Sequence, residues 1–184
     1  MILNGSSIIN IEVFDVNQII ESSETRHGAS CAIYTDDYNS RVFLSRIWGK
    51  GELYVNFIML NPSTATHTQL DPTVTRCYNW GKAWGFDGIF ITNIFALRST
   101  DPKNLYVVNN PKGSGNDKAI GWTARKSSKI IAAWGRHGLL HNRSSEVLEI
   151  LKNHKIYGLK LTKDGIPGHP LYLPSNSKPF PLNE

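Results

Sequence analysis

The chain has 184 residues, 40% of them hydrophobic, so it can bury one sizeable core and is short for two full domains. We therefore expect a single domain over residues 1–184, with an N-terminal extension at 1–50 and a core at 51–184. The formal net charge of +5 comes from Lys and Arg spread along the chain, a modest bias toward polyanions or a phosphate-bearing ligand. The two cysteines lie far apart and suggest neither a disulfide framework nor a zinc site, which fits a reduced cytoplasm. The chain has no signal-like leader and no apolar run of about 20 residues, so we expect a cytoplasmic protein without a membrane segment.

The N-terminal extension contains two β-rich runs, at residues 30–34 and 41–48. They surround residues 35–40, a cluster of turn-forming residues, which predicts a hairpin. We expect this hairpin to flank the main sheet. Residues 1–27 mix a short apolar stretch with a polar run, and we expect them to form only a lead-in to the fold.

From about residue 53 onward, strand-like and helix-like segments alternate. This alternation is typical of right-handed βαβ units. We therefore expect a three-layer α/β/α sandwich around a mainly parallel four-stranded sheet, with the hairpin as an N-terminal extension. The expected strands cover about 54–60, 88–92, 129–134 and 156–161, and the expected helices about 74–84, 116–128 and 147–153. Asp71 and Pro72 supply the cap and the first residue of the first helix.

Each expected strand is followed by a short polar or glycine-containing segment. Because the loops beyond the carboxyl ends of parallel strands share one edge of the sheet, we expect these segments to converge on a single crevice. The four segments are Asn61-Pro62-Ser63-Thr64-Ala65, Asn93-Ile94-Phe95-Ala96, Trp134-Gly135-Arg136-His137-Gly138 and Gly168-His169-Pro170-Leu171-Tyr172.

Two asparagines at strand ends are candidate ligand-binding residues. The amide of Asn61 offers a donor and an acceptor, so it can read a nucleobase edge or position a water, with Pro62 and Ser63 beside it. The alternative for this segment is an Asx-Pro turn with a helix cap. Asn93 needs a partner for its carboxamide, and that partner is either a bound ligand or a neighbouring loop.

Cationic residues follow two of the strands. Arg98 can hold a phosphate in bidentate fashion. Trp134 and Gly135 let a ligand approach the backbone closely, and Arg136 and His137 can then bind an anion or form hydrogen bonds. The alternative for His137 is an ordinary loop histidine.

The last segment supplies an imidazole and an aromatic ring. His169 can stabilise a departing anionic base, donate a proton or hold a phosphate, and the alternative is a structural hydrogen bond in a proline-rich loop. Tyr172 can stack on a base. Trp80 and Trp84 lie four residues apart on an expected helix, which favours core packing for that pair.

Several common enzyme motifs are absent from the sequence. The chain has no phosphate-binding loop of the Gly-x-x-x-x-Gly-Lys type, no Gly-x-Ser-x-Gly elbow and no His-Glu-x-x-His motif. The segment 113–115 has two glycines but lacks the strand-to-helix context of a dinucleotide site. We therefore expect no metal ion and no nicotinamide or other cofactor.

Long, ordered motifs of the chain resemble those of a domain-of-unknown-function family, number 1643, that is found in bacteria and phages. The resemblance extends from about Arg41 to Pro174. The motifs that carry it include Phe57-Ile58-Met59-Leu60-Asn61-Pro62-Ser63-Thr64-Ala65, Asp71-Pro72-Thr73, Asn93-Ile94-Phe95-Ala96, Ala132-Ala133-Trp134-Gly135 and His169-Pro170-Leu171-Tyr172-Leu173-Pro174. The family has no established reaction, so this resemblance implies no activity.

A second, weaker resemblance is to the uracil-DNA glycosylase superfamily, whose active-site motifs lie at the strand ends of a four-stranded parallel sheet. The segment after the first strand is similar to a Gly-x-Asn-Pro motif of one subgroup. The resemblance implies that Asn61 positions a water, that Asn93 reads a flipped base and that His169 contacts the scissile nucleotide. Leu171 stands where the superfamily has serine, and no aspartate stands in the first motif, which argues against rapid uracil excision.

The resulting hypothesis is a base-processing enzyme that acts on DNA, a glycosylase-like hydrolase that flips out a modified or mismatched pyrimidine. Asn61 and His169 are its candidate catalytic residues. Two alternatives stay open: a non-catalytic nucleic-acid-binding module that uses the same crevice, and an enzyme for a free nucleotide or nucleoside, in which Arg98 and Arg136 hold phosphate.

Overall fold

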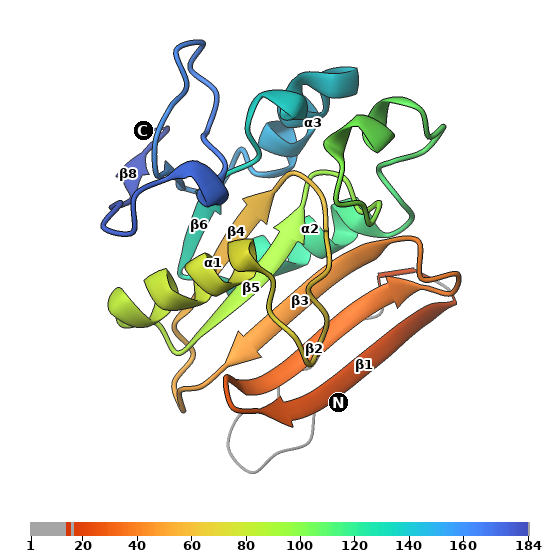
Figure 1. The fold of residues 1–184 in the computed structure, drawn as a ribbon. Coiled ribbons are helices and arrows are strands. Elements are labelled where there is room, and N and C mark those ends of the chain that lie inside the picture. The colour runs from red at the N-terminus through yellow and green to blue at the C-terminus, as the bar shows by residue number, and fades with distance from the viewer. Residues whose placement is uncertain (1–13, 16, 184) are drawn as a thin grey trace.

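The computed structural model describes residues 14, 15 and 17–183, and in this part of the chain eight strands form one mixed sheet (Figure 1). The strand order is β1-β2-β3-β5-β4-β6-β7-β8. The strands are β1 Gln18–Thr25, β2 Gly28–Thr35, β3 Arg41–Ile47, β4 Tyr54–Met59, β5 Gly88–Asn93, β6 Lys129–Ala132, β7 Ile156–Gly158 and β8 Phe180–Pro181. The helices are α1 Pro72–Ala83, α2 Asn116–Lys126 and α3 Arg143–Ile150, with short 3-10 helices η1 Pro102–Tyr106, η2 Arg136–Asn142 and η3 Pro170–Tyr172.

The sheet combines parallel and antiparallel pairings. Strands β5, β4, β6 and β7 pair in parallel, whereas the β1-β2-β3-β5 and β7-β8 pairings are antiparallel. The mixed α/β class is therefore confirmed, and so is the hairpin formed by β2 and β3. The prediction of a mainly parallel, four-stranded sheet is wrong, because β3 pairs directly with β5 and makes the hairpin part of the same sheet.

Strand β1 was not expected from the sequence. Its segment, Gln18–Thr25, alternates between half-buried and exposed positions and contains mostly polar residues. It therefore lacks the alternation of apolar and polar residues that marks a half-buried strand. The strand forms because the backbone of β2 supplies a complete antiparallel partner, with pairs from Gln18 with Thr35 to Thr25 with Gly28.

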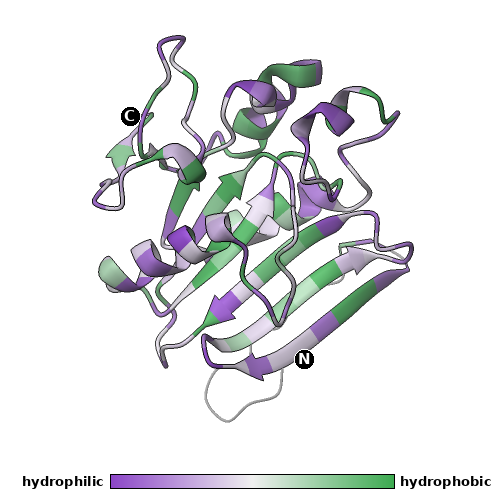
Figure 2. Cartoon of the chain, in the orientation of Figure 1, coloured by the Kyte–Doolittle hydropathy of each residue, from purple (hydrophilic) through white to green (hydrophobic). Residues whose placement is uncertain are grey.

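Helices cover both faces of the central strands. Val74, Cys77 and Trp80 of α1 pack with Val55 and Phe57 of β4 on one face. On the opposite face, α2 and α3 pack against the alternate side chains of β4 and β6, including Ile58 and Ala132. This division follows from the alternation of side chains along a strand. In Figure 2 the central strands are largely hydrophobic, while hydrophobic and hydrophilic residues alternate along α1.

Local sequence signals explain the bounds of α1. Asp71 caps the helix, because its Oδ1 accepts a hydrogen bond from the Val74 N–H at 2.8 Å, and Pro72 is the first helical residue. The helix ends before Gly85, whose φ of +79° lies in the left-handed region. The cap places the N-terminus of α1 next to the loop that follows β4.

Candidate functional site

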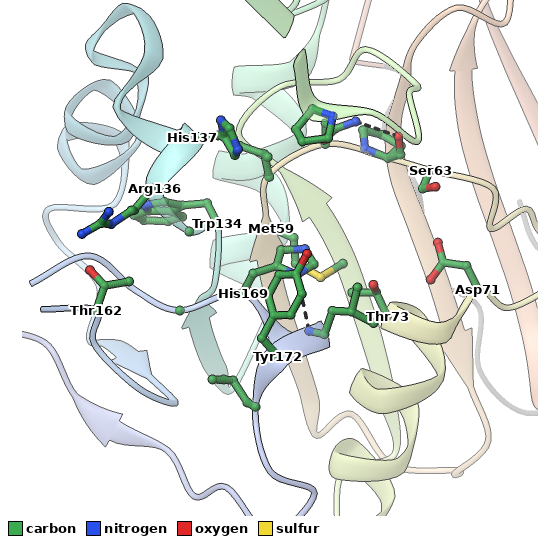
Figure 3. A pocket seen from close by; sticks show the side chains of 18 of the residues that line it. Met59, Ser63, Asp71, Thr73, Trp134, Arg136, His137, Thr162, His169 and Tyr172 are labelled. Atoms are coloured by element: carbon green, nitrogen blue, oxygen red, sulfur yellow. Dashed lines mark hydrogen bonds between the residues drawn. The ribbon is translucent and has the colours of Figure 1, made fainter. Parts of the chain in front are cut away.

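A cavity of about 790 Å³ lies at the carboxyl ends of the parallel strands (Figure 3). Four loops contribute to it: the loops after β4, β5, β6 and β7, the second of them through Ser99 and Thr100. The remaining walls come from the N-terminus of α1, from Pro102 at the start of η1 and from the side chain of Arg41. In Figure 3 Ser63, Asp71 and Thr73 lie on one side of the pocket, and Trp134 and Arg136 lie on the other.

Most of the residues that the sequence predicted for this site come together in the pocket. Arg98 and Asn93 are the exceptions, because neither lines it. The predicted residues that do line it are Asn61, Pro62, Ser63, Trp134, Gly135, Arg136, His137, His169 and Tyr172.

The amide nitrogen of Asn61 connects two loops. It donates to the carbonyl oxygens of Ser99 at 2.8 Å, Leu97 at 3.4 Å and Pro62 at 3.0 Å. This nitrogen is therefore already engaged, while Oδ1 can still accept a hydrogen bond from a ligand. The structure thus gives Asn61 a structural role in the pocket wall in addition to any contact with a ligand.

Arg98 binds the hairpin turn rather than the pocket. Its Nη1 donates to the Tyr38 carbonyl at 3.0 Å, and its guanidinium lies over the ring of Tyr34, 5.2 Å from the ring centre. The sequence suggested phosphate binding because Arg98 follows a strand end. The actual contacts depend on the hairpin, which is distant in sequence.

Asn93 lies behind the pocket wall. It pairs with Met59 across β5 and β4, so both side chains are on the same face of the sheet, and Met59 lines the cavity. Asn93 is 1% exposed, and within the described part of the chain neither its Oδ1 nor its Nδ2 has a hydrogen-bond partner. Burying an unpaired carboxamide is unfavourable, so this residue is a candidate for ligand binding.

His169 is held as a neutral imidazole. Its Nδ1 accepts a hydrogen bond from the Leu171 N–H at 3.3 Å, at the start of η3. Burial lowers the pKa of His169 to about 4, and the nearby Asp71 opposes part of this shift. At neutral pH the single ring proton is thus assigned to Nε2, which makes His169 a hydrogen-bond donor without a charge.

This low pKa predicts a specific dependence of stability on pH. The unfolded chain binds a proton at His169 near pH 6.5, whereas the folded chain binds it only near pH 4. The stability that the neutral His169 contributes to the folded protein is therefore fully present above pH 6.5 and is lost as the pH falls toward 4. We expect a loss of roughly 2 kcal/mol in the free energy of unfolding, after allowance for partial exposure. Urea unfolding at pH 7 and pH 4.5 measures it.

The matched variant for this measurement is His169→Asn, because an asparagine oxygen can replace Nδ1 as the acceptor at the start of η3. The difference in stability between wild type and variant should shrink between pH 7 and pH 4.5. If the free energies of unfolding of wild type and variant differed by the same amount at both pH values, His169 would have an ordinary pKa in the folded protein.

The pocket mouth is basic and aromatic. Arg136 forms an exposed ion pair with Asp164, and the Nδ1 of His137 lies 3.0 Å from the Tyr106 hydroxyl. Tyr172 is 81% exposed and is free to stack on a ligand. The contact of His137 with Tyr106 agrees with the loop alternative for this histidine.

Two glycines shape the wall around Trp134. The indole is 1% exposed and lines the pocket. A Cβ at Gly138 would lie 2.3 Å from the indole, so only glycine leaves room for it. Gly135 has φ +72°, and a Cβ there would lie 3.6 Å from the Cβ of His169, which shows how closely the two loops approach.

Sequence reasoning misses several of the residues that line the pocket, among them Asp71 and Arg41. Asp71 was recognised from the sequence only as a helix cap, yet it lines the pocket and only its Oδ1 is used by the cap. Arg41 was assigned only to the hairpin, yet it lines the pocket and is 1% exposed. Burial lowers the pKa of Arg41 to about 10, while Tyr34 and Asp71 act in the opposite direction. Its position follows from the pairing of β3 with β5, which no local pattern reveals.

Among the described residues, no group of three or more His, Cys, Asp and Glu side chains is arranged to hold a metal ion. The expectation of a protein without metal or cofactor stays a prediction. No helix in the described part of the chain is long and apolar enough to cross a membrane.

Comparison with known proteins identifies the family. The searches of curated proteins and of solved structures found no match to the chain. The likeness to uracil-DNA glycosylases therefore stays a hypothesis. Residues 41–171 match the model of a family described as "Protein of unknown function (DUF1643)", and this range extends from the first residue of β3 into η3. Since the match covers more than half of the sequence, the chain belongs to this family of proteins of unknown function.

Proposed function

We propose that the protein is a base-processing enzyme that acts on DNA, a glycosylase-like hydrolase of the N-glycosidic bond of a modified or mismatched pyrimidine. The observation that carries the proposal is the convergence of four strand-end loops on one cavity with a neutral imidazole at its side. A cavity of about 790 Å³ has room for a flipped nucleoside.

Recognition of a base needs donors, acceptors and a stacking surface. Asn61 offers its free Oδ1, and Asn93 offers a complete carboxamide, which can pair with both a donor and an acceptor on a base edge. Met59 stands beside Asn93, so a flipped base would reach the carboxamide after a shift of this flexible side chain. Tyr172 supplies an exposed ring for stacking.

The proposed reaction separates charge. The bond between C1′ and the base nitrogen breaks, its electron pair leaves with the base, and water adds to C1′. The Nε2–H of His169 donates a hydrogen bond to the departing base and stabilises its negative charge. Asp71 is the carboxylate in the pocket wall that can take a proton from the attacking water.

The test uses DNA that carries uracil, mismatched pyrimidines or hypermodified pyrimidines, with mass spectrometry for released base and abasic sites. We expect release of one base, with a reduction of about 10²- to 10³-fold in His169→Asn. The control is His141→Asn, because His141 is exposed, lies outside the pocket lining and has φ +53°, which asparagine tolerates. Intact DNA with every substrate would contradict the proposal.

One observation favours a second candidate, an enzyme for a free nucleotide. The pocket is lined by Arg41, Arg136, Lys160 and Lys163 and by one carboxylate, Asp71, which suits a small anionic ligand. Turnover of a mononucleotide in the absence of DNA would favour this candidate over the first. Binding without turnover of any substrate would favour a nucleic-acid-binding module instead.

A further inference from the structure

Two fully buried arginines lie on β3 and lack a direct carboxylate partner. Arg41 is 1% exposed and Arg46 is 0% exposed. Within the described residues neither forms an ion pair, although Asp71 lies close enough to favour the charged form of Arg41. A buried guanidinium is unfavourable unless hydrogen bonds use its donors. The hydrogen bonds of each arginine therefore indicate its role.

Arg46 uses both of its Nη atoms within the protein, although its buried Nε, like that of Arg41, has no partner among the described residues. Its two Nη atoms donate to the Ser30 hydroxyl and to the carbonyl oxygens of Ser45, Thr66 and Gln69. These contacts fasten the loop between β4 and α1. Arg46 does not line the pocket, so its role is structural.

Arg41 uses fewer of its donors than Arg46 does. Its Nη1 donates to the Ala65 carbonyl, whereas neither its Nη2 nor its buried Nε has a hydrogen-bond partner in the described part of the chain. The side chain also lines the pocket. A guanidinium with an unused donor at a cavity wall is a binding group for an oxyanion.

A second source of positive potential stands beside Arg41. The N-terminus of α1, a helix of 12 residues, lies at the pocket, and Thr73 in its first turn lines the cavity with its hydroxyl (Figure 3). Helix N-termini favour anions through their free N–H groups and their dipole. The carboxylate of Asp71 also lies at this helix N-terminus, and its negative charge repels an anionic ligand. This repulsion disfavours a ligand group with two negative charges and favours a phosphodiester, which carries one.

We propose that Arg41 and the first turn of α1 at Thr73 form a phosphate subsite of the pocket. Its ligand class is a phosphate ester of a nucleotide, either an internal phosphodiester of DNA or the phosphate of a mononucleotide. The nucleotide part rests on the proposed function, whereas the preference for phosphate does not. Lys160 and Lys163 at the pocket mouth raise the local concentration of such ligands.

The experiment compares the affinities of thymidine, thymidine 5′-monophosphate and the dinucleotide TpT by calorimetry. We expect both phosphate compounds to bind more tightly than thymidine. In Arg41→Gln this advantage should fall about 10- to 100-fold, with thymidine affinity unchanged. The matched control is Arg98→Gln, because Arg98 binds the Tyr38 carbonyl outside the pocket and its replacement should leave the advantage intact.

A second measurement needs no variant and covers the case in which Arg41→Gln does not fold. Nuclear magnetic resonance of the wild-type protein follows the Nε–H signal of Arg41 during addition of thymidine monophosphate or TpT. A saturable shift supports the subsite, and the stronger of the two ligands identifies the source of the phosphate. Equal affinities for thymidine and its monophosphate, no binding of either phosphate compound, or an unchanged Arg41 signal would each overturn the subsite.

The outcomes separate this subsite from the proposed function. Base release from DNA without any preference for phosphate would overturn the subsite and leave the glycosylase proposal standing. A phosphate preference that depends on Arg41, without release of any base, would retain the subsite and contradict the glycosylase proposal.

Discussion

The Asn93→Leu variant is expected to be more stable than the wild type and inactive in base release. Both polar atoms of the Asn93 side chain are buried and unpaired within the described chain, so the wild type bears the penalty of an unsatisfied carboxamide. Leucine has the same branched shape and needs no hydrogen bonds. Removing a buried, unsatisfied polar group gains about 1 to 3 kcal/mol, but leucine is larger than asparagine and its extra volume costs part of this gain. We therefore expect the free energy of unfolding to rise by about 1 kcal/mol.

The same change removes the carboxamide that the proposed function assigns to base recognition. A site built to form hydrogen bonds loses far more than an apolar site when one of these groups is removed, so we expect base release to fall about 10²- to 10⁴-fold. Urea unfolding and the base-release assay measure the two effects separately. The stability gain does not depend on the proposed function, whereas the activity loss does.

Asn56→Leu is the matched control. Asn56 is also buried in the sheet, but its Oδ1 accepts from the Thr92 hydroxyl at 3.2 Å and its Nδ2 donates to the Thr123 hydroxyl at 3.0 Å. Its replacement breaks both bonds and should lower the free energy of unfolding by about 1 to 3 kcal/mol. Equal losses of stability in the two variants would show that Asn93 is satisfied in the folded protein.

Residues 54–59 and 88–93 show what local sequence can predict. Both segments are apolar, short and bounded by turn-forming residues, and they form β4 and β5. Asp71 and Pro72 identified the start of α1 for the same reason, because a cap and a first-turn proline act over a few residues. The sequence also predicts that the strand-end loops share one edge of the sheet, and in the structure Asn61 and His169 from two of these loops line the same pocket.

Long-range pairings could not be predicted in this way. The antiparallel pairing of β3 with β5 turns the expected extension into part of the sheet and carries Arg41 to the pocket wall. The contacts of Asn61 with the 97–99 loop and of Arg98 with the hairpin turn join segments that are 36 to 60 residues apart. No periodicity within one segment encodes these contacts, because they depend on which strands become neighbours.

The largest expected effect on stability is that of Arg46→Met. The variant removes the donors for the Ser30 hydroxyl and for the carbonyl oxygens of Ser45, Thr66 and Gln69. Ser30 and Ser45 are buried and Thr66 is half-buried, so their acceptors lose the guanidinium with little water to replace it. Each acceptor left unsatisfied costs about 1 to 3 kcal/mol, and relief from the desolvation of the buried charge offsets part of this sum, which leaves a net cost of about 3 to 5 kcal/mol. We therefore expect the free energy of unfolding to fall by this amount, measured by urea unfolding at neutral pH.

The control for this variant is Arg125→Met on the exposed side of α2, which should change the free energy of unfolding by less than about 0.5 kcal/mol. Because Arg46 holds the loop that precedes Asp71, the same variant should also expose that loop to proteolysis before the rest of the protein unfolds. If Arg46→Met were as stable as the Arg125 variant, the hydrogen bonds of Arg46 would contribute no net stability, and methionine packing would replace them fully.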